Sequence, residues 1–303
     1  MKRYDMVIIG GGPGGYTAAL YAARAGRKAI VLEKLSAGGQ MALTSQIDNY
    51  PGFPEGVDGF ELADSMQQQA ERYGAETELA EVTALHLEGE SKRIETTEGD
   101  FEAKTVVIAT GAGPKYLGLE QEQALIGRGV HYCAHCDGMF YRGKIVAVVG
   151  GGNSAVADAL HLSRLAKKVI LIHRRDSLRA EKIYEKALRE AENIEFLWNS
   201  TVSELLHEGR LNGIRVADVQ TGREREIPID GLFISVGRKP ATDLVKGQLD
   251  LDEAGYIVAD ESTRASIPGV FAVGDVRTKA LRQVVTAVAD GAVAAHFADQ
   301  YIG

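Results

Sequence analysis

Cys133 and Cys136 are the only cysteines of the chain, and two residues separate them. In Cys-X-X-Cys motifs the thiolate is stabilised and disulfide exchange is fast, so the pair could carry redox chemistry. A structural disulfide closing so short a loop would contribute only about 2 kcal/mol, and a zinc site normally needs a second, separate pair of ligands. We therefore interpret the pair as a redox-active dithiol and expect no metal; a structural disulfide and a metal site are the alternatives.

Two glycine-rich segments have the spacing of dinucleotide-binding turns. They align when the chain is shifted by 140 residues, with small residues at Gly10, Gly12, Gly15, Gly150, Gly152 and Ala155. In such a turn the first glycine permits a tight bend, the second lets backbone approach a pyrophosphate, and the third small residue lets helix and strand pack closely. The N–H groups at the start of the following helix then face the phosphates. Both segments are predicted to bind nucleotides.

Each glycine segment must be positioned by a βαβ unit. Short β-branched runs predict buried strands, and Ala/Leu-rich stretches predict helices. The predicted order is strand, helix, strand in both copies, over 7–9, 14–25 and 29–32, then 145–149, 153–165 and 169–172. The repeat predicts an α/β protein with two Rossmann-like (three-layer ββα) dinucleotide-binding domains, the second inserted into the first.

The length of 303 residues agrees with two domains. Residues 109–114 leave the first domain after a strand-then-glycine pattern, and residues 238–240 leave the second. We expect one domain over 1–115 and 244–303, and another over 116–243 that carries the cysteine pair.

The two copies differ where their ligands should differ. Glu33 ends the second strand of the first copy, where a carboxylate can accept hydrogen bonds from both ribose hydroxyls of an adenosine. The second copy has His173, Arg174 and Arg175 there, followed by Arg179. Two arginines would favour a 2′-phosphate, and hence NADPH over NADH, by roughly 10²–10⁴-fold. A solvated basic turn is the alternative interpretation.

Two nucleotide sites and one dithiol suggest an electron route. A nicotinamide does not efficiently reduce a disulfide directly, whereas a flavin can accept its hydride and pass both electrons to sulfur. The sequence therefore predicts electron flow from NADPH through FAD to the cysteine pair and on to a partner's disulfide.

Charge and hydropathy limit the other possibilities. Lys and Arg number 34 against 42 Asp and Glu, so the net charge of −8 argues against binding nucleic acid or anionic membranes. The first apolar run, 6–9, is too short for a signal peptide, and no run approaches the ~18 residues of a membrane span. We expect a cytoplasmic protein.

Several segments together resemble the low-molecular-weight, bacterial-type NADPH-dependent thioredoxin reductases, a class of the pyridine nucleotide-disulfide oxidoreductase family. The resemblance covers essentially the full chain. The matching segments are residues 10–15, 38–40, 48–52, 133–138, 150–155, 173–175, 274–275 and 282–283.

The resemblance implies which residues hold each cofactor. Those implied for FAD are Gly10, Gly12, Pro13, Gly14, Gly15, Glu33, Lys34, Gly39, Gln40, Asn49, Val82, Thr110, Gly111, Gly274, Asp275, Arg282, Gln283 and Val284. Those implied for NADPH are Gly152, Asn153, Ser154, Ala155, His173, Arg174, Arg175 and Arg179. The domain over 1–115 and 244–303 would then bind FAD, and the domain over 116–243 would bind NADPH.

The resemblance also implies roles for the cysteine segment. Cys136 would be the sulfur nearest the flavin, Cys133 the nucleophile toward thioredoxin, and Asp137 the general acid. His131 and His135 depart from the Ser and Thr that are usual there, and this difference bears on the potential of the disulfide and on the identity of the partner. A homodimer is implied. The alternatives are a related reductase with another electron donor or another small redox protein, and a flavin-based redox sensor.

Overall fold

The repeated strand–helix–strand pattern folds into two units built on one plan. In the computed structural model, which describes residues 1–44, 46–180, 187–188 and 190–303, one unit comprises Met1–Gly113 with Lys239–Gly303. The other comprises Pro114–Arg238. The second unit is thus inserted into the first, and the predicted α/β class is confirmed. The expected boundaries lie a few residues farther along the chain at both crossings.

The first unit is built on a mainly parallel sheet. Its strands are β1 (Lys2–Ile9), β2 (Ala29–Glu33), β3 (Glu76–Leu79), β4 (Val82–His86), β5 (Lys92–Thr96), β6 (Phe101–Ile108) and β17 (Val270–Ala272). Strands β3, β2, β1, β6 and β17 run parallel, whereas β4 and β5 pair antiparallel and continue onto β6. The last four residues of β1 and of β6, the first four of β2 and all of β17 are buried, so these parts of the strands are mainly apolar rather than alternating.

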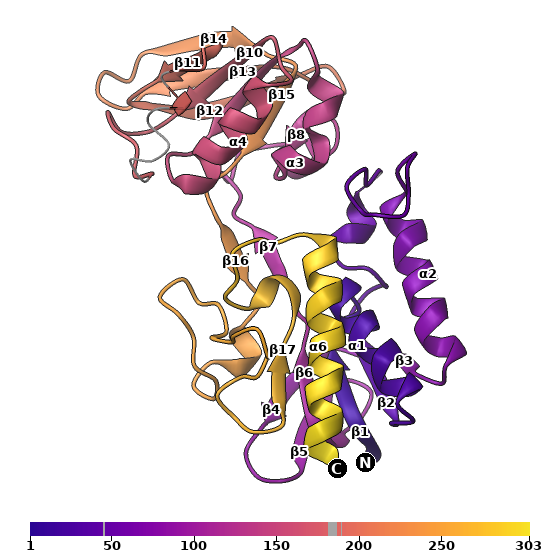
Figure 1. Cartoon of the computed structure of the whole chain (residues 1–303). Helices are drawn as coiled ribbons and strands as arrows, with labels where there is room; N and C mark the ends of the chain where they lie inside the picture. Colours follow the sequence, from indigo (N-terminus) through magenta and orange to yellow (C-terminus); the bar gives the residue numbers. More distant parts are fainter. Residues whose placement is uncertain (45, 181–186, 189) are drawn as a thin grey trace. The chain divides into compact units, whose positions relative to one another are not determined.

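Three α-helices lie among the described residues of the first unit. They are α1 (Pro13–Arg24), α2 (Gly59–Arg72) and α6 (Val284–Ile302), and α1 and α6 lie side by side in Figure 1. Their close packing depends on small residues, since a Cβ on Gly291 would lie 2.2 Å from the Gly14 carbonyl oxygen. This packing places the N-terminal ends of α1 and α6 near each other.

The second unit repeats the parallel sheet on a smaller scale. Its sheet order is β11 (Ile194–Leu197), β10 (Lys168–Ile172), β9 (Ile145–Val149), β15 (Gly231–Ile234) and β8 (Val130–His131). A separate antiparallel sheet contains β12 (Ser200–His207), β13 (Leu211–Asp218) and β14 (Glu224–Pro228). Its α-helices among the described residues are α3 (Ala134–Asp137) and α4 (Asn153–Ser163), and two short 3-10 helices span Gln123–Leu125 and Gly138–Tyr141.

The two crossings between the units are themselves paired. Strand β7 (Ala112–Pro114) forms a two-stranded sheet with β16 (Arg238–Pro240). Hydrogen bonds from Lys115 N to Gly237 O (3.0 Å) and from Ala241 N to Gly111 O (3.0 Å) flank this sheet. The chain therefore leaves and re-enters the first unit at one place.

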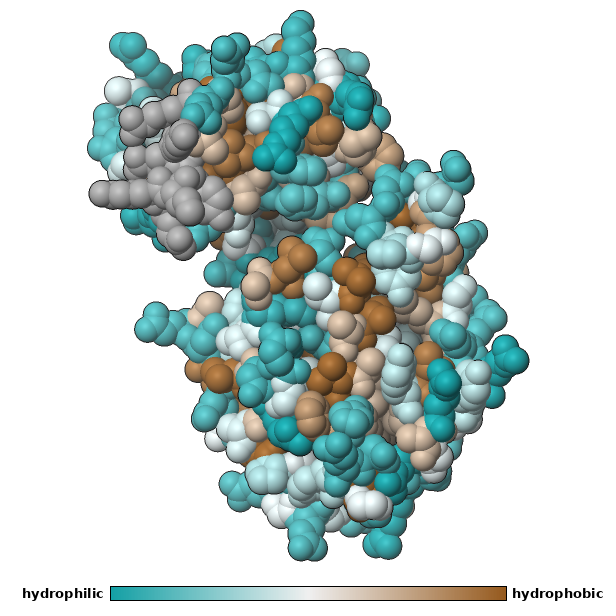
Figure 2. Space-filling model, viewed as in Figure 1, coloured by the Kyte–Doolittle hydropathy of each residue, from teal (hydrophilic) through white to brown (hydrophobic). Residues whose placement is uncertain are grey.

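The surface of both units is mixed in character. On the face shown in Figure 2, hydrophobic residues lie in small groups among hydrophilic ones. Among the residues that the structure describes, none of the helices combines the length and apolar character that a membrane crossing requires.

Candidate active site

The first glycine loop follows β1, and its positions 10 and 15 leave no room for a side chain. Gly10 has φ +104°, and a Cβ there would lie 2.5 Å from the Ala109 carbonyl oxygen. A Cβ on Gly15 would lie 2.0 Å from the Gly10 oxygen, whereas one on Gly12 would meet nothing within 4 Å. Gly12 is the N-cap of α1 and provides no side-chain hydrogen bond, so the first N–H groups of the helix are left for an external acceptor.

Glu33 is anchored against this loop. One carboxylate oxygen, Oε2, accepts a hydrogen bond from Gly11 N at 2.7 Å, and Oε1 accepts one from Leu35 N at 3.1 Å. The carboxylate thus stands at the end of β2 beside the phosphate-binding turn, where ribose hydroxyls would be recognised. Its neighbour Lys34 forms an exposed ion pair with Glu81 instead, 2.6 Å from Nζ to Oε1.

Other residues expected at the flavin lie at the carboxyl ends of the same parallel strands. Thr110 follows β6, and its hydroxyl donates to the Ala241 oxygen at 2.7 Å. Gly111 has φ +70°, Gly274 has φ +72° and follows β17, and Asp275 comes next. These strand ends share one edge of the sheet with Gly10 and Glu33, which is the edge at which open α/β sheets commonly bind ligands.

The remaining predicted residues of this unit lie in several places. Asn49 Nδ2 donates to Gln283 Oε1 at 3.0 Å, which joins the 48–52 segment to the start of α6. Gln283 is the N-cap of α6 and forms a capping box with Thr286, and Val284 is the first helical residue. Gly39 (φ +53°) and Gln40 are exposed, whereas the Val82 side chain is buried in the core, which leaves its backbone as the part available to a ligand.

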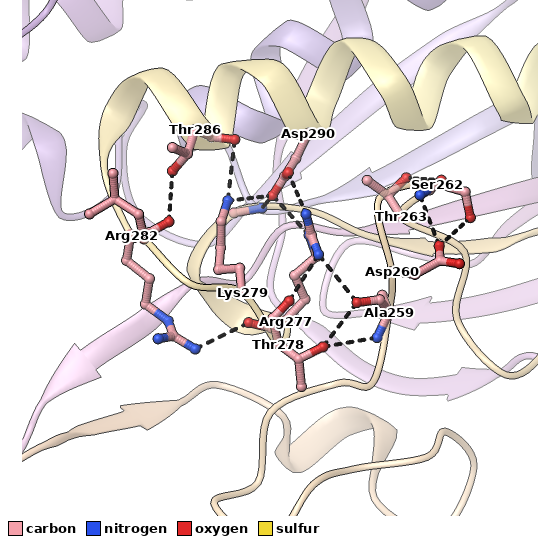
Figure 3. A network of polar contacts seen from close by, with 12 residues as sticks. Ala259, Asp260, Ser262, Thr263, Arg277, Thr278, Lys279, Arg282, Thr286 and Asp290 are labelled. Carbon is pink, nitrogen blue, oxygen red and sulfur yellow. Dashed lines mark hydrogen bonds and ion pairs between the residues drawn. The ribbon is translucent and has the colours of Figure 1, made fainter. Parts of the chain in front are cut away.

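A buried ion cluster behind Gly274 was not predicted from the sequence (Figure 3). Asp290 of α6 accepts hydrogen bonds from the Arg277 guanidinium (Nη2–Oδ1 2.8 Å, Nε–Oδ2 3.0 Å) and from Lys279 Nζ (2.7 Å). The Gly274 N–H donates to the same carboxylate at 2.9 Å. Arg282 is linked to the cluster, since its Nη2 donates to the Arg277 oxygen at 3.2 Å. The cluster therefore fixes the whole 274–282 segment on α6.

Asp290 is buried, yet its carboxylate stays ionised. Burial disfavours the carboxylate, but hydrogen bonds from Arg277 and Lys279 outweigh that effect and hold the pKa of Asp290 below its ordinary value. The side chains of Asp290, Arg277 and Lys279 are all buried. Such a cluster is costly to disrupt, because removal of one member leaves the others buried without compensation.

The second glycine loop has the same architecture in the inserted unit. Gly150 follows β9 with φ +153°, and a Cβ there would lie 2.4 Å from the Ser235 oxygen and 2.6 Å from the Ala155 Cβ. Gly152 is open on its Cβ side and is the N-cap of α4, with no side-chain cap. Asn153 and Ser154 are exposed in the first turn of that helix. A phosphate could therefore approach this backbone as well.

His173 is packed directly onto this second loop. A Cβ on Gly151 would lie 2.2 Å from its Cε1, and Arg179 N donates to the Gly151 oxygen at 2.7 Å. Among the described residues its Nε2 is buried and finds no hydrogen-bond partner. Burial, followed by Arg179, Arg175 and Arg174, lowers the pKa of His173. These three arginines are exposed at the end of β10, so a bound anion would meet several cations there.

Cys133 and Cys136 form a disulfide in the same unit. The S–S distance is 2.07 Å, the Cα atoms are 5.3 Å apart, and both residues are partly exposed. Cys133 is the N-cap of α3, and its sulfur accepts a hydrogen bond from Cys136 N at 3.2 Å. The pair is thus accessible at the surface, as exchange with another protein requires.

Asp137 is the last residue of α3 and is in contact with His131. Its Oδ2 lies 2.9 Å from His131 Nδ1, and its side chain is partly exposed. Tyr141 lies on the other side of the imidazole, with its hydroxyl 2.6 Å from Nε2. Tyr141 was not predicted as part of the site, because spacing along the chain does not relate it to the cysteines.

Two large apolar side chains lie exposed immediately after the cysteine segment. Met139 and Phe140 retain 50% and 41% of their accessible surface. Exposed hydrophobic residues of this size beside a reactive pair are suited to contact another protein.

The chain is similar to known proteins over nearly its full length. The sequence profile of the pyridine nucleotide-disulphide oxidoreductase family matches residues 4–291. A thioredoxin reductase of Streptomyces coelicolor is 45% identical over 301 residues, which cover 98% of this chain and 94% of that protein. One of Mycolicibacterium smegmatis is 42% identical, with 99% and 96% covered. The crystal structure of a Streptococcus pyogenes thioredoxin reductase superposes with a TM-score of 0.92 at 43% identity, covering 99% of this chain and 98% of that one.

Proposed function

The chain belongs to the pyridine nucleotide-disulphide oxidoreductase family, and we propose that it is a thioredoxin reductase that uses NADPH and FAD. The observation that carries the proposal is the accessible Cys133–Cys136 disulfide, which lies in the same unit as a nucleotide loop bordered by arginines. A structural disulfide would not require that neighbourhood, whereas a reductase does.

The first unit suits FAD. The open Gly12 backbone and the uncapped start of α1 would hold the pyrophosphate, and the anchored Glu33 would hold the adenosine ribose. Asp275, Arg282 and Gln283 lie on the segment that the Asp290 cluster fixes, and they would line the polar side of the flavin. When bound, the flavin supplies the two-electron chemistry between a nicotinamide and a disulfide.

The second unit suits NADPH. The open Gly152 would admit the pyrophosphate, while Arg174, Arg175 and Arg179 would bind the 2′-phosphate. The unpartnered Nε2 of His173 supports a ligand at this place, since a buried polar atom normally finds a partner.

The partner that we propose is thioredoxin or a thioredoxin-like protein. Cys133 would attack its disulfide, Cys136 would then close the enzyme disulfide, and Met139 with Phe140 would provide apolar contact. Asp137 would supply the proton that a leaving thiolate takes up. We further propose a homodimer, and a cytoplasmic location because disulfides of reducing compartments are usually transient and catalytic.

Anaerobic stopped-flow spectroscopy tests the function. NADPH should bleach the bound flavin of the purified enzyme, and thioredoxin should then reoxidise it through many turnovers. A colourless protein after reconstitution with FAD, or a single oxidation without turnover, would contradict the proposal; the second result would indicate a redox sensor.

The variant Cys133→Ser separates the two half-reactions. It should retain flavin bleaching by NADPH, because the nucleotide loops are unchanged, but it should lose thioredoxin turnover. Turnover near the wild-type rate would refute the assigned cysteine route. Size-exclusion chromatography with light scattering tests the proposed dimer on the same sample.

A further inference from the structure

His131 is a buried imidazole two residues before the cysteine pair, and both of its ring nitrogens are engaged. It is 6% exposed. Nδ1 lies 2.9 Å from Asp137 Oδ2, and Nε2 lies 2.6 Å from the Tyr141 hydroxyl. The three side chains therefore form a continuous chain of hydrogen bonds from the end of α3 into the interior of the unit.

The surroundings fix the orientation of this ring. It stacks on Phe233 with centroids 5.2 Å apart and an interplanar angle of 26°, and Tyr141 meets it edge-on at 5.2 Å. Tyr141 is 1% exposed, and burial raises the pKa of its hydroxyl, so the phenol keeps its proton. Because the ring cannot turn away, it must exchange protons through these two contacts.

The hydrogen-bond chain can exist in two protonation states without moving heavy atoms. As an imidazolium, His131 donates from Nδ1 to Asp137 and from Nε2 to the Tyr141 oxygen. As a neutral imidazole, it accepts from the Tyr141 hydroxyl and donates to the Asp137 carboxylate. The charged groups that face Tyr141 from neighbouring elements are Arg210, Asp230 and Lys144.

We propose that His131 is a positioning residue that stores, between Asp137 and Tyr141, the proton taken up when the Cys133–Cys136 disulfide is reduced. This inference rests on the proposed function. The role requires a side chain that can hold a proton on either or both of two ring nitrogens, as an imidazole can.

The stoichiometry of the reaction requires such a proton. NADPH, one proton and the disulfide give NADP⁺ and two thiols: the S–S bond breaks, the hydride provides both electrons and one hydrogen, and the second hydrogen arrives as a proton. Asp137 adjoins Cys136 in the chain and can deliver that proton, and the imidazolium of His131 can then reprotonate the carboxylate. On exchange with the partner disulfide the proton moves in the reverse direction.

The pH dependence of thiol alkylation tests the proposal without partner turnover. The holoenzyme is reduced with dithiothreitol, desalted anaerobically and alkylated with iodoacetamide between pH 5 and 9. The rate should rise in two steps as the pH increases, and we assign the first step to loss of the stored proton from His131. In His131→Asn, which can still contact both neighbours but cannot hold the proton, the first step should disappear. Turnover with thioredoxin at pH 7 should fall about tenfold with unchanged KM, less than the ~10²–10⁴ loss of a general acid.

His135→Asn is the matched control. His135 also lies beside the cysteines, but its ring packs on His161 with centroids 4.1 Å apart rather than on Asp137. The first step should persist in that variant. Should His131→Asn fold poorly, Tyr141→Phe provides the second test. This change removes the hydrogen bond at Nε2 from both protonation states of His131, so the first step should move to another pH, and a first step that keeps its wild-type position would overturn the role of His131.

The outcomes separate the two proposals. The role of His131 would be overturned if both alkylation steps persisted in His131→Asn. It would also be overturned if the first step disappeared in His135→Asn. Failure of the wild-type enzyme to reduce thioredoxin would instead overturn the proposed function, and the alkylation profile would still report on the proton.

Discussion

The two glycine loops share one backbone plan and differ in what is placed against it. In the first loop the anchored Glu33 carboxylate accepts a hydrogen bond from Gly11 N. In the second, the His173 ring covers Gly151, and Arg179 donates its N–H to the Gly151 oxygen. The residue that ends the second strand therefore contacts the same glycine of the loop in both units. The same scaffold thus carries a carboxylate after the second strand of one unit and a histidine followed by arginines after the second strand of the other.

The loops also differ in what supports them from behind. Gly14 of the first loop approaches α6, since a Cβ there would lie 3.0 Å from the Ala287 oxygen, and α6 carries Asp290. At the second loop the third small residue is Ala155 rather than glycine, and the space accommodates its methyl group. The first loop is therefore the more tightly constrained of the two.

The largest effect is expected from Arg174→Ala combined with Arg175→Ala. If these arginines bind the 2′-phosphate, KM for NADPH should rise by roughly 10²–10⁴ relative to KM for NADH. Steady-state kinetics with both nucleotides measures the ratio. If KM for NADPH and KM for NADH rose by the same factor, the arginines of the second loop would not recognise the 2′-phosphate.

Asp290→Asn should destabilise the protein by about 3–5 kcal/mol, because Arg277 and Lys279 remain buried without their carboxylate. Urea unfolding at pH 7 and the rate of flavin release measure the change. The control is Asp299→Asn on the same helix, whose ion pair with Arg27 is partly exposed. That control should cost only about 0–1 kcal/mol.

The effect of Asp290→Asn on stability should depend on pH. Since the pKa of Asp290 is lower in the folded protein than the ~3.9 of an unfolded aspartate, its contribution is complete above that value and is lost as pH falls below it. The stability difference between wild type and Asp290→Asn should therefore be constant from pH 7 to about 5 and shrink below about 4. A difference that grew in acid would contradict this assignment.

Gly15→Ala and Ala155→Gly compare the loops at the same position. The first change places a methyl group 2.0 Å from the Gly10 oxygen and should cost about 1–3 kcal/mol or more, with loss of FAD. The second only removes a methyl group at the start of α4 and should cost about 0.5–1 kcal/mol. Flavin content and denaturant titrations measure both variants. Equal losses in the free energy of unfolding would show that the first loop is no more tightly packed than the second.

Glu33→Gln should have the smallest effect on the cofactors, about a tenfold loss of FAD affinity, because an amide accepts ribose hydrogen bonds more weakly than a carboxylate. Fluorescence of released flavin measures it. Glu78→Gln, which changes a partly exposed carboxylate of β3 paired with Lys2, serves as the control and should leave FAD affinity unchanged.

The sequence predicts the two glycine loops because the residues that define each loop lie close together along the chain. The run 145–149 predicts β9 with the bounds observed, and Glu33 and His173 are recognisable because each polar residue ends an apolar strand. The Asp290 cluster is different, since it joins residues 11 and 13 positions apart through a loop. The apolar pattern of α6 does not indicate that Asp290, unlike Asp299 of the same helix, faces the interior. The contact of His131 with Tyr141 likewise depends on how α3 turns, which spacing does not determine.

The paired strands β7 and β16 have a topological consequence. Neighbouring strands lie about 4.8 Å apart, so the chain ends left by excising 114–238 would already be within reach of a short reverse turn. The second unit is thus inserted between two paired strands, and the sheet of the first unit contains no strand from it. A shortened polypeptide closed there should fold alone and turn yellow with FAD while reducing nothing.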